Sequence, residues 1–234
     1  MNKQSKLLDQ LFTAAKTGNV AALKKLAAQG VPLDIRQKET GFSPCLVAAG
    51  LGQVEALAFL VENGVNVNEV TARGTSTLML AAAQGHISMV NWLLNNGADV
   101  TLKNESNDTV LSYALQLFEG PERVLNDIVK FLLAHGVELE NRETELGFTP
   151  LMLASHKGYS SIVKLLVAHG ADVNAASARQ KNDSKQTGGK NSPGDNTKRG
   201  FPIELITVSV PETPLTLAKT PEIRAYLKEH GAKE

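Results

Sequence analysis

The sequence predicts an all-α solenoid of stacked helix-turn-helix units that are joined by hairpin loops. The first observation is a repeat: similar text begins at Gly41, Gly74, Asn107 and Gly147, at intervals of 33, 33 and 40 residues. A nearly constant period of this size is typical of stacked supersecondary units. The second observation is the composition, because aromatic residues make up only 5% of the chain while Ala and Leu are frequent. This composition favours close packing of short helices.

The clearest unit, residues 147–174, shows which helices and loop each repeat is expected to contain and in what order. Thr149 is a suitable N-cap, and Pro150 follows at the first helical position, where a missing N–H costs no hydrogen bond. Gly158 is expected to end this first short helix. Apolar residues then recur at helical spacing as far as Gly170, which is expected to take the left-handed conformation that closes the second helix. Each unit therefore contains two helices followed by a loop.

This unit resembles the ankyrin repeat, whose hallmarks are Thr-Pro-Leu-His at the first helix and Gly-Ala-Asp-Val-Asn before the loop. Residues 149–151 and 170–174 carry both hallmarks here. The hallmark His is replaced in successive copies by Leu46, Met79, Ser112, Met152 and Thr216. The resemblance implies an ankyrin-repeat solenoid that forms a single domain over residues 1–234, with repeats at approximately 6–36, 37–69, 70–102, 103–141, 142–174 and 212–234.

Three irregularities interrupt the pattern. The fourth copy carries extra residues around Phe118–Arg123, which we expect to lengthen its first helix or the turn after it. The last copy lacks the Gly between its helices, and Pro221 is expected to begin its second helix. An insertion occupies residues 175–211. Its part Arg179–Gly200 contains no large apolar residue and is predicted to be disordered, whereas Phe201–Val210 is β-prone and is expected to dock on the array.

Charge and composition limit the function. Lys plus Arg and Asp plus Glu number 24 each, so no net field draws the chain toward nucleic acid or a membrane. The first residues lack the apolar run of a secretion signal, and no stretch approaches the ~18 apolar residues that span a bilayer. A single cysteine excludes an internal disulfide and suits a reducing compartment. We expect a cytoplasmic, monomeric protein without membrane contact.

The candidate chemical sites have plainer explanations. Cys45 shares its column with leucines of other copies, which predicts a buried packing residue rather than a nucleophile. Three histidines share another column, but stacked helices lie about 8–10 Å apart, too far for one metal ion: His135, His169 and His230. A third column is interpreted as packing between repeats rather than as a ligand platform: Phe59, Trp92, Phe131, Leu165 and Tyr226. We predict no catalytic residue, cofactor or metal, and no enzyme activity.

The resemblance instead implies a surface for a protein partner. In ankyrin-repeat proteins the hairpin tips and the exposed side of the first helices form a concave binding face. The pattern assigns to the tips Arg36, Lys38, Phe42, Arg73, Thr75, Glu105, Asp108, Arg142, Glu145 and Phe148. It assigns to the first helices Leu51, Gln84, Leu117 and His156. Phe42 and Phe148 are the expected anchors, because an aromatic side chain surrounded by charges is typical of a binding hot spot. We expect a non-enzymatic scaffold, adaptor or inhibitor.

An alternative function uses the insertion. Between residues 179 and 199 six basic side chains stand against two acidic ones, which favours weak, salt-dependent binding of a polyanion or nucleic acid. No base-reading motif and no stacking aromatic residue accompanies them. Binding of nucleic acid is therefore the second hypothesis, after binding of a protein.

Overall fold

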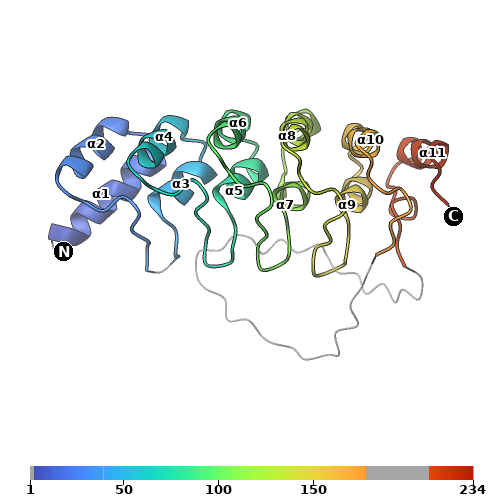
Figure 1. The fold of residues 1–234 in the computed structure, drawn as a ribbon, viewed down its shortest axis with the longest axis horizontal. Coiled ribbons are helices and arrows are strands. Elements are labelled where there is room, and N and C mark those ends of the chain that lie inside the picture. Colours follow the sequence, from blue (N-terminus) through green and yellow to red (C-terminus); the bar gives the residue numbers. More distant parts are fainter. Residues whose placement is uncertain (1–2, 39, 178–210, 234) are drawn as a thin grey trace, which may run out of the picture.

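The computed structural model describes residues 3–38, 40–177 and 211–233. In this part of the chain the regular structure is helical, apart from one isolated antiparallel bridge between Val70 and Ser76. The helices follow one another along an elongated stack, with the two termini at opposite ends (Figure 1). They are α1 (Lys3–Thr17), α2 (Val20–Ala28), α3 (Pro44–Gly50), α4 (Val54–Glu62), α5 (Thr77–Ala83), α6 (Ile87–Asn95), α7 (Val110–Leu117), α8 (Glu122–Ala134), α9 (Pro150–Lys157), α10 (Ser160–Ala168) and α11 (Pro221–Glu229).

The helices form two layers, and the hairpins project from one of them (Figure 1). The first helices of the repeats, α1, α3, α5, α7 and α9, pack against one another in sequence. The second helices, α2, α4, α6, α8, α10 and α11, form the other layer. Each hairpin leaves a second helix, extends beyond the first-helix layer and returns to begin the next first helix. This arrangement confirms the all-α solenoid of stacked helix pairs that the repeat pattern predicts.

Capping residues fix where the first helices begin. The side-chain oxygen of each cap accepts a hydrogen bond from the N–H three residues later, and the caps are Ser43, Ser76, Thr109, Thr149 and, for the last second helix, Thr220. Pro44, Pro150 and Pro221 follow three of these caps directly. Most of these helices have only 7 to 9 residues, too few to be stable alone. Stacking therefore supplies most of their stability.

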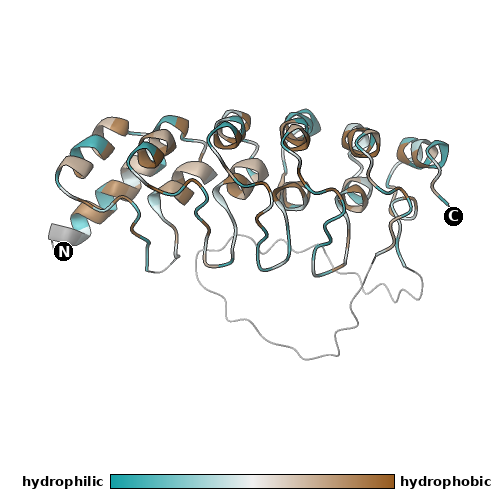
Figure 2. Ribbon diagram, viewed as in Figure 1, coloured by the Kyte–Doolittle hydropathy of each residue, from teal (hydrophilic) through white to brown (hydrophobic). Residues whose placement is uncertain are grey.

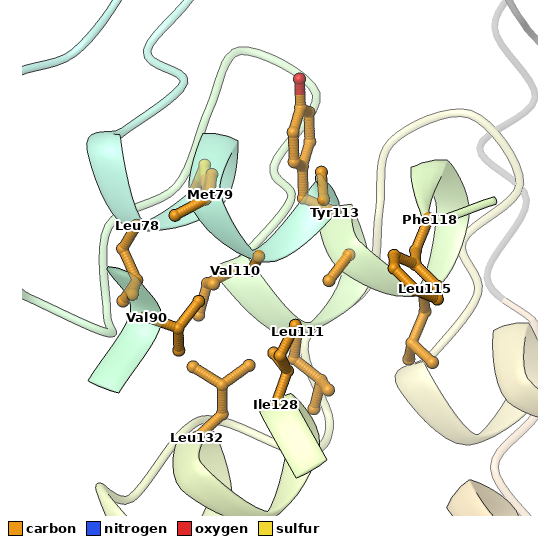
Figure 3. Close-up of a cluster of buried hydrophobic side chains, with 14 of the residues drawn as sticks. Leu78, Met79, Val90, Val110, Leu111, Tyr113, Leu115, Phe118, Ile128 and Leu132 are labelled. Carbon is orange, nitrogen blue, oxygen red and sulfur yellow. The ribbon is translucent and has the colours of Figure 1, made fainter. Parts of the chain in front are cut away.

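The core runs through the whole stack as one continuous cluster, from Leu11 in the first repeat to Leu227 in the last. Apolar residues recur along its full length (Figure 2). Figure 3 shows its middle, where Leu78, Val90 and Leu132 from neighbouring repeats lie together. Since each repeat buries its apolar side chains against its neighbours, we expect a substitution here to act mainly on adjacent repeats.

Asparagines at the repeat ends tie one repeat to the next. Asn68 Nδ2 donates to the Gly97 carbonyl at 3.1 Å, and its Oδ1 accepts from the Asp99 N–H at 2.8 Å. Asn174 makes the same two bonds across the insertion, to the Gly231 carbonyl at 3.0 Å and from the Lys233 N–H at 2.8 Å. The last repeat is therefore held in register with the array although a long segment separates it in sequence.

The sequence predicts that the extra residues of the fourth repeat lengthen its first helix or the turn after it, but they lengthen mainly its second helix, and the turn, residues 118–121, only slightly. Helix α8 has 13 residues, whereas α4, α6 and α10 have 9 each. With Phe131 aligned to Phe59 and Trp92, the added turn is residues 122–125, and its Leu125 is fully buried in the core. Phe118 fills the space at the longer turn: it is buried, and an added Cβ on Gly85 would lie 2.6 Å from its ring.

The last repeat is shortened. Pro221 is the first residue of α11, as predicted, and the preceding first helix is reduced to a turn at residues 214–217. The predicted disorder of Arg179–Gly200, the docking of Phe201–Val210 and the basic segment 179–199 lie outside the described residues.

Candidate protein-binding face

We call the surface formed by the exposed side of the first helices and by the hairpins the inner face. Its helices are α3, α5, α7 and α9, and its hairpin tips are residues 36–42, 69–75, 103–109 and 141–148. All four tips project from the same side of the first-helix layer (Figure 1). The face therefore collects side chains that are about one repeat apart in sequence.

A backbone hydrogen bond closes every tip in the same way. The bonds run from Gln37 N to Phe42 O, Thr71 N to Thr75 O, Asn104 N to Asp108 O and Glu143 N to Phe148 O, at 2.8 to 3.3 Å. The return of each chain needs a positive φ, at Gly41, Gly74, Asn107 and Gly147. Asn107, at φ 59°, is the one non-Gly residue in that region among the described residues, and Asn tolerates it better than most side chains do. The requirement for a positive φ explains why Gly or Asn recurs at these four positions, from which the repeat is first recognised.

Two arginines brace the tips. Arg36 Nη1 donates to the carbonyl of Gly41 in its own tip at 3.0 Å and to that of Val70 in the next tip at 2.8 Å. Arg142 repeats this pattern, with bonds to Gly147 at 3.1 Å and Ala176 at 2.5 Å. Both guanidinium groups thus link neighbouring hairpins. Their bonds position the tips. Because Arg36 is exposed and Arg142 half-buried, the assignment of both to partner contact stays a prediction.

Asp108 and Thr75 lie inside the tips rather than on them. Asp108 is 4% exposed, and its carboxylate accepts from Gln116 Nε2 at 2.6 Å and from Asn104 Nδ2 at 3.1 Å. Burial, with a smaller contribution from Glu143, raises the pKa of Asp108, while the hydrogen bonds from Asn104 and Gln116 oppose the rise. Thr75 is also buried. Their assignment to the exposed face is wrong, because both side chains complete the hairpin interior.

The prediction that Phe148 is an exposed anchor for a partner is also wrong. It is 3% exposed and belongs to the continuous core cluster. The tip above it folds around Glu143, whose carboxylate accepts from the N–H groups of Glu145, Leu146 and Phe148 at 2.6, 2.8 and 3.0 Å. Because the closed tip covers the ring, the apolar surface of Phe148 is removed from water, which stabilises the folded state. Phe42, at the equivalent place in the second repeat, remains half-buried.

Other assigned residues do lie at the surface. On the first helices or just after them, Leu51 is 45% exposed, Gln84 and His156 are exposed, and Leu117 is half-buried. Leu51 is the one exposed large hydrophobic side chain among the described residues. On the tips, the exposed assigned residues are Arg36, Lys38, Arg73, Glu105 and Glu145.

Sequence reasoning missed several residues of the face. Val47 and Leu80 are half-buried on α3 and α5, each four residues after its N-cap. Tyr113 has the same place on α7; it is mostly buried, and Figure 3 shows its hydroxyl directed away from the labelled core side chains. Their shared position, four residues after the N-cap of each first helix, is the sequence signal that could have identified them. Together with Leu51 and Leu117, Val47 and Leu80 form an apolar surface over three repeats, which we call the apolar column.

Basic groups gather at the C-terminal end of the face. Lys157, at the end of α9, donates from Nζ to the Gln116 carbonyl at 3.0 Å. Partial desolvation, together with the neighbouring Lys157 and Lys219, lowers the pKa of His156. The pKa of Lys157 is lowered by the same desolvation and by Lys219, although Glu119 opposes this. Glu212 lies near His156 and Glu119 near Lys157, so acidic groups offset the two lysines at this end of the face.

The remaining candidate sites behave as packing residues. Cys45 is fully buried, and burial, with a smaller contribution from Glu69, raises the pKa of its thiol to about 12. The prediction of a buried packing residue is confirmed. The five residues of the aromatic column are partly buried and pack against the core, as interpreted from the sequence. Each of the three column histidines places Nδ1 2.8 Å from a carbonyl of its own helix.

Among residues 3–38, 40–177 and 211–233, no three His, Cys, Asp or Glu side chains lie close enough together to hold a metal ion. None of the described helices has the length and apolar character needed to cross a bilayer.

Comparison with known proteins connects this geometry to one family. The family model for ankyrin repeats, described as three copies, matches residues 11–104 and 78–177. The crystal structure of the human ASB11 ankyrin repeat domain superposes with a TM-score of 0.68 at 26% identity, covering 95% of this chain and 84% of that one.

Two proteins of known sequence are also similar. The ankyrin repeat and KH domain-containing protein mask-1 of Caenorhabditis elegans is 33% identical over 166 residues, which cover 70% of this chain and 5% of that protein. Delta-latroinsectotoxin-Lt1a of Latrodectus tredecimguttatus is 35% identical over 83 residues, 35% of this chain and 6% of that protein. The chain thus spans a small part of both relatives.

Proposed function

Because the chain belongs to the ankyrin repeat family, we propose that its inner face binds a protein partner and that the array acts without catalysis, as a scaffold, adaptor or inhibitor. Such arrays expose a continuous surface of repeated helices and hairpins, which recognises a partner by shape and by its exposed side chains. The proposal concerns the surface of this chain, and the activity and partners of its longer relatives are not transferred to it.

The observation that carries the proposal is the apolar column on the first helices. Leu51 exposes 45% of its surface, and the half-buried Val47, Leu80 and Leu117 continue the column over three repeats. Binding of a partner would remove this apolar surface from water, which supplies most of the affinity of a typical interface core. Since Phe148 is buried, the anchors are aliphatic side chains of the helices together with the half-buried Phe42.

The tips would supply the polar rim of the interface. Lys38, Arg73, Glu105 and Glu145 are exposed around the apolar column, and charged groups at a rim contribute to orientation and association rate more than to affinity. The hydrogen bonds of Arg36 and Arg142 hold the tips in place in the free protein. A preorganised surface loses less entropy on binding.

The test is affinity capture with a variant of the face. Leu51→Asp together with Leu117→Asp places two charges in the apolar column, and we expect it to lower capture of the partner at least about tenfold, by analogy with the loss of a buried anchor. Circular dichroism checks that the helices remain. A matched control, Ser88→Asp with Ala225→Asp, adds the same charge to exposed positions of second helices and should capture as the wild type does.

Equal capture by the two double variants would contradict the proposal. We further propose that the complex forms in the cytoplasm with a monomeric array, since the one thiol is buried and needs no oxidising environment. Sedimentation of the purified chain checks the monomer.

A further inference from the structure

Two Asn-Gly pairs occur in the sequence, Asn63-Gly64 and Asn96-Gly97, and each follows a second helix. Asn-Gly is the dipeptide most prone to deamidation, because glycine has no side chain to hinder attack by its backbone nitrogen and its backbone turns freely. We propose that Asn96 is a site of spontaneous deamidation in this chain, and that isoaspartate formed there loosens the joint between the second and third repeats. The site lies at the end of α6, in the second-helix layer.

The two pairs share most of their local geometry. Asn63 and Asn96 are the C-cap residues of α4 and α6, and both are exposed. Each donates from Nδ2 to a carbonyl one turn earlier in its helix, at 2.7 Å for Asn63 and 2.8 Å for Asn96. Each following glycine has a positive φ, and an added Cβ on it would meet no atom within 4 Å. Both sites therefore have room for a cyclic imide, and both must first release the side-chain bond.

The peptide group between asparagine and glycine distinguishes the two sites. The Gly64 N–H donates to the Val61 carbonyl at 3.0 Å, and the glycines that follow α2, α8, α10 and α11 make the equivalent bond. The Gly97 N–H and the Asn96 carbonyl, by contrast, have no hydrogen-bond partner among the residues that the structure describes. Cyclisation requires this peptide group to rotate, since the glycine nitrogen has to approach the side-chain carbon of the asparagine. At Asn96 the rotation breaks no hydrogen bond of the peptide group.

Deamidation at Asn96 needs only the chain and water. The Gly97 backbone nitrogen loses its proton and attacks Cγ of Asn96. A bond forms between these two atoms, the bond from Cγ to Nδ2 breaks, and the Nδ2 group takes up the proton and leaves as ammonia. Water then opens the cyclic imide at either carbonyl. One opening gives aspartate with the ordinary backbone, and the other gives isoaspartate, in which the side-chain methylene becomes part of the main chain.

Both products disturb the joint between the second and third repeats. A carboxylate at position 96 cannot donate to the Trp92 carbonyl, and its negative charge is unfavourable at the C-terminal end of a helix. Isoaspartate also lengthens the main chain just before the two groups that Asn68 holds, the Gly97 carbonyl at 3.1 Å and the Asp99 N–H at 2.8 Å. We therefore expect isoaspartate to weaken this tie between the repeats.

Ageing of the purified chain at mildly alkaline pH, followed by peptide mapping with mass spectrometry, tests the proposal. Deamidation should be faster at Asn96 than at Asn63. The ratio of the two rates should be at least about threefold larger in the native chain than in urea, because native Gly64 must first break an ordinary hydrogen bond. The measurement in urea controls for the different neighbours in sequence. Asn96→Gln keeps a donor amide and should lose the modification at this position.

Hydrogen exchange measures the effect on the joint. The Asp99 N–H should exchange faster in the aged wild type than in the fresh protein, and equally in fresh and aged Asn96→Gln. Equal native rates at the two asparagines, a faster rate at Asn63, or no deamidation at Asn96 would refute the site. A rate ratio that is the same in urea would refute the role of the unbonded peptide group. Unchanged exchange at Asp99 in protein that contains isoaspartate would refute the loosened joint.

Discussion

Replacing Phe148 with Ala tests whether this aromatic residue belongs to the core or to the binding face. Its side chain is 3% exposed, so the substitution removes a nearly complete set of core contacts and leaves a cavity. Truncation of a buried Phe costs about 3–5 kcal/mol in the free energy of unfolding. Phe42, at the matching position of the second repeat, is half-buried. We expect Phe42→Ala to cost about 1–2 kcal/mol, because only part of its apolar area is removed from water.

Urea unfolding, followed by far-ultraviolet circular dichroism, measures both variants. A repeat array can unfold in more than one step, so the midpoints are compared together with hydrogen exchange of the individual repeats. We expect Phe148→Ala to accelerate exchange in α7 and α9 more than in α3. Equal midpoints for Phe148→Ala and Phe42→Ala would refute the reasoning, since the two rings would then be equally exposed.

Three further predictions concern single residues. The thiol of Cys45, with its pKa of about 12, should not react with a disulfide reagent at pH 8 in the folded protein and should react once urea unfolds it; fast reaction in the native state would contradict its burial. The pKa of Asp108 is raised in the folded state, so its carboxyl binds a proton more tightly there, and the free energy of unfolding should rise as pH falls through that pKa and level off below the ordinary value of about 3.9. A carboxyl NMR titration at or below that value would exclude this effect. Gly85→Ala should destabilise more than Gly97→Ala, because both have positive φ but only Gly85 meets a side chain, the ring of Phe118; equal midpoints would show that the ring moves aside.

Local signals in the sequence predict most of the fold. Caps such as Thr149, the Pro that follows, and the Gly residues at positive φ act within a few positions of the chain, so their effect can be read from a short window. Asn107 meets the same backbone requirement without being Gly. The column of Cys45 is enough to place that residue in the core. The array of helix pairs is therefore predictable from residue patterns within single repeats.

The candidate face is less predictable because distant contacts decide which side chains are exposed. Phe148 and Asp108 follow the same tip pattern as exposed residues, but Gln116 and Glu143 bond to them or to their backbone and complete buried hairpins. The contact of Lys219 with Ser155 is not evident from the repeat pattern, because Lys219 reaches α9 from beyond an insertion of unrelated sequence. Residue spacing within one repeat contains no information about such contacts.

Site-specific photo-crosslinking tests the role of the inner face most directly. A photoreactive residue replaces Leu51 in one protein and Ser88, which is exposed on α6 in the other helix layer, in a second. Each protein is irradiated with the captured partner, and adducts are measured by mass. Binding on the inner face predicts a covalent adduct from position 51 and none above background from position 88. An adduct from position 88 alone would contradict the proposed function and place the partner on the second helices.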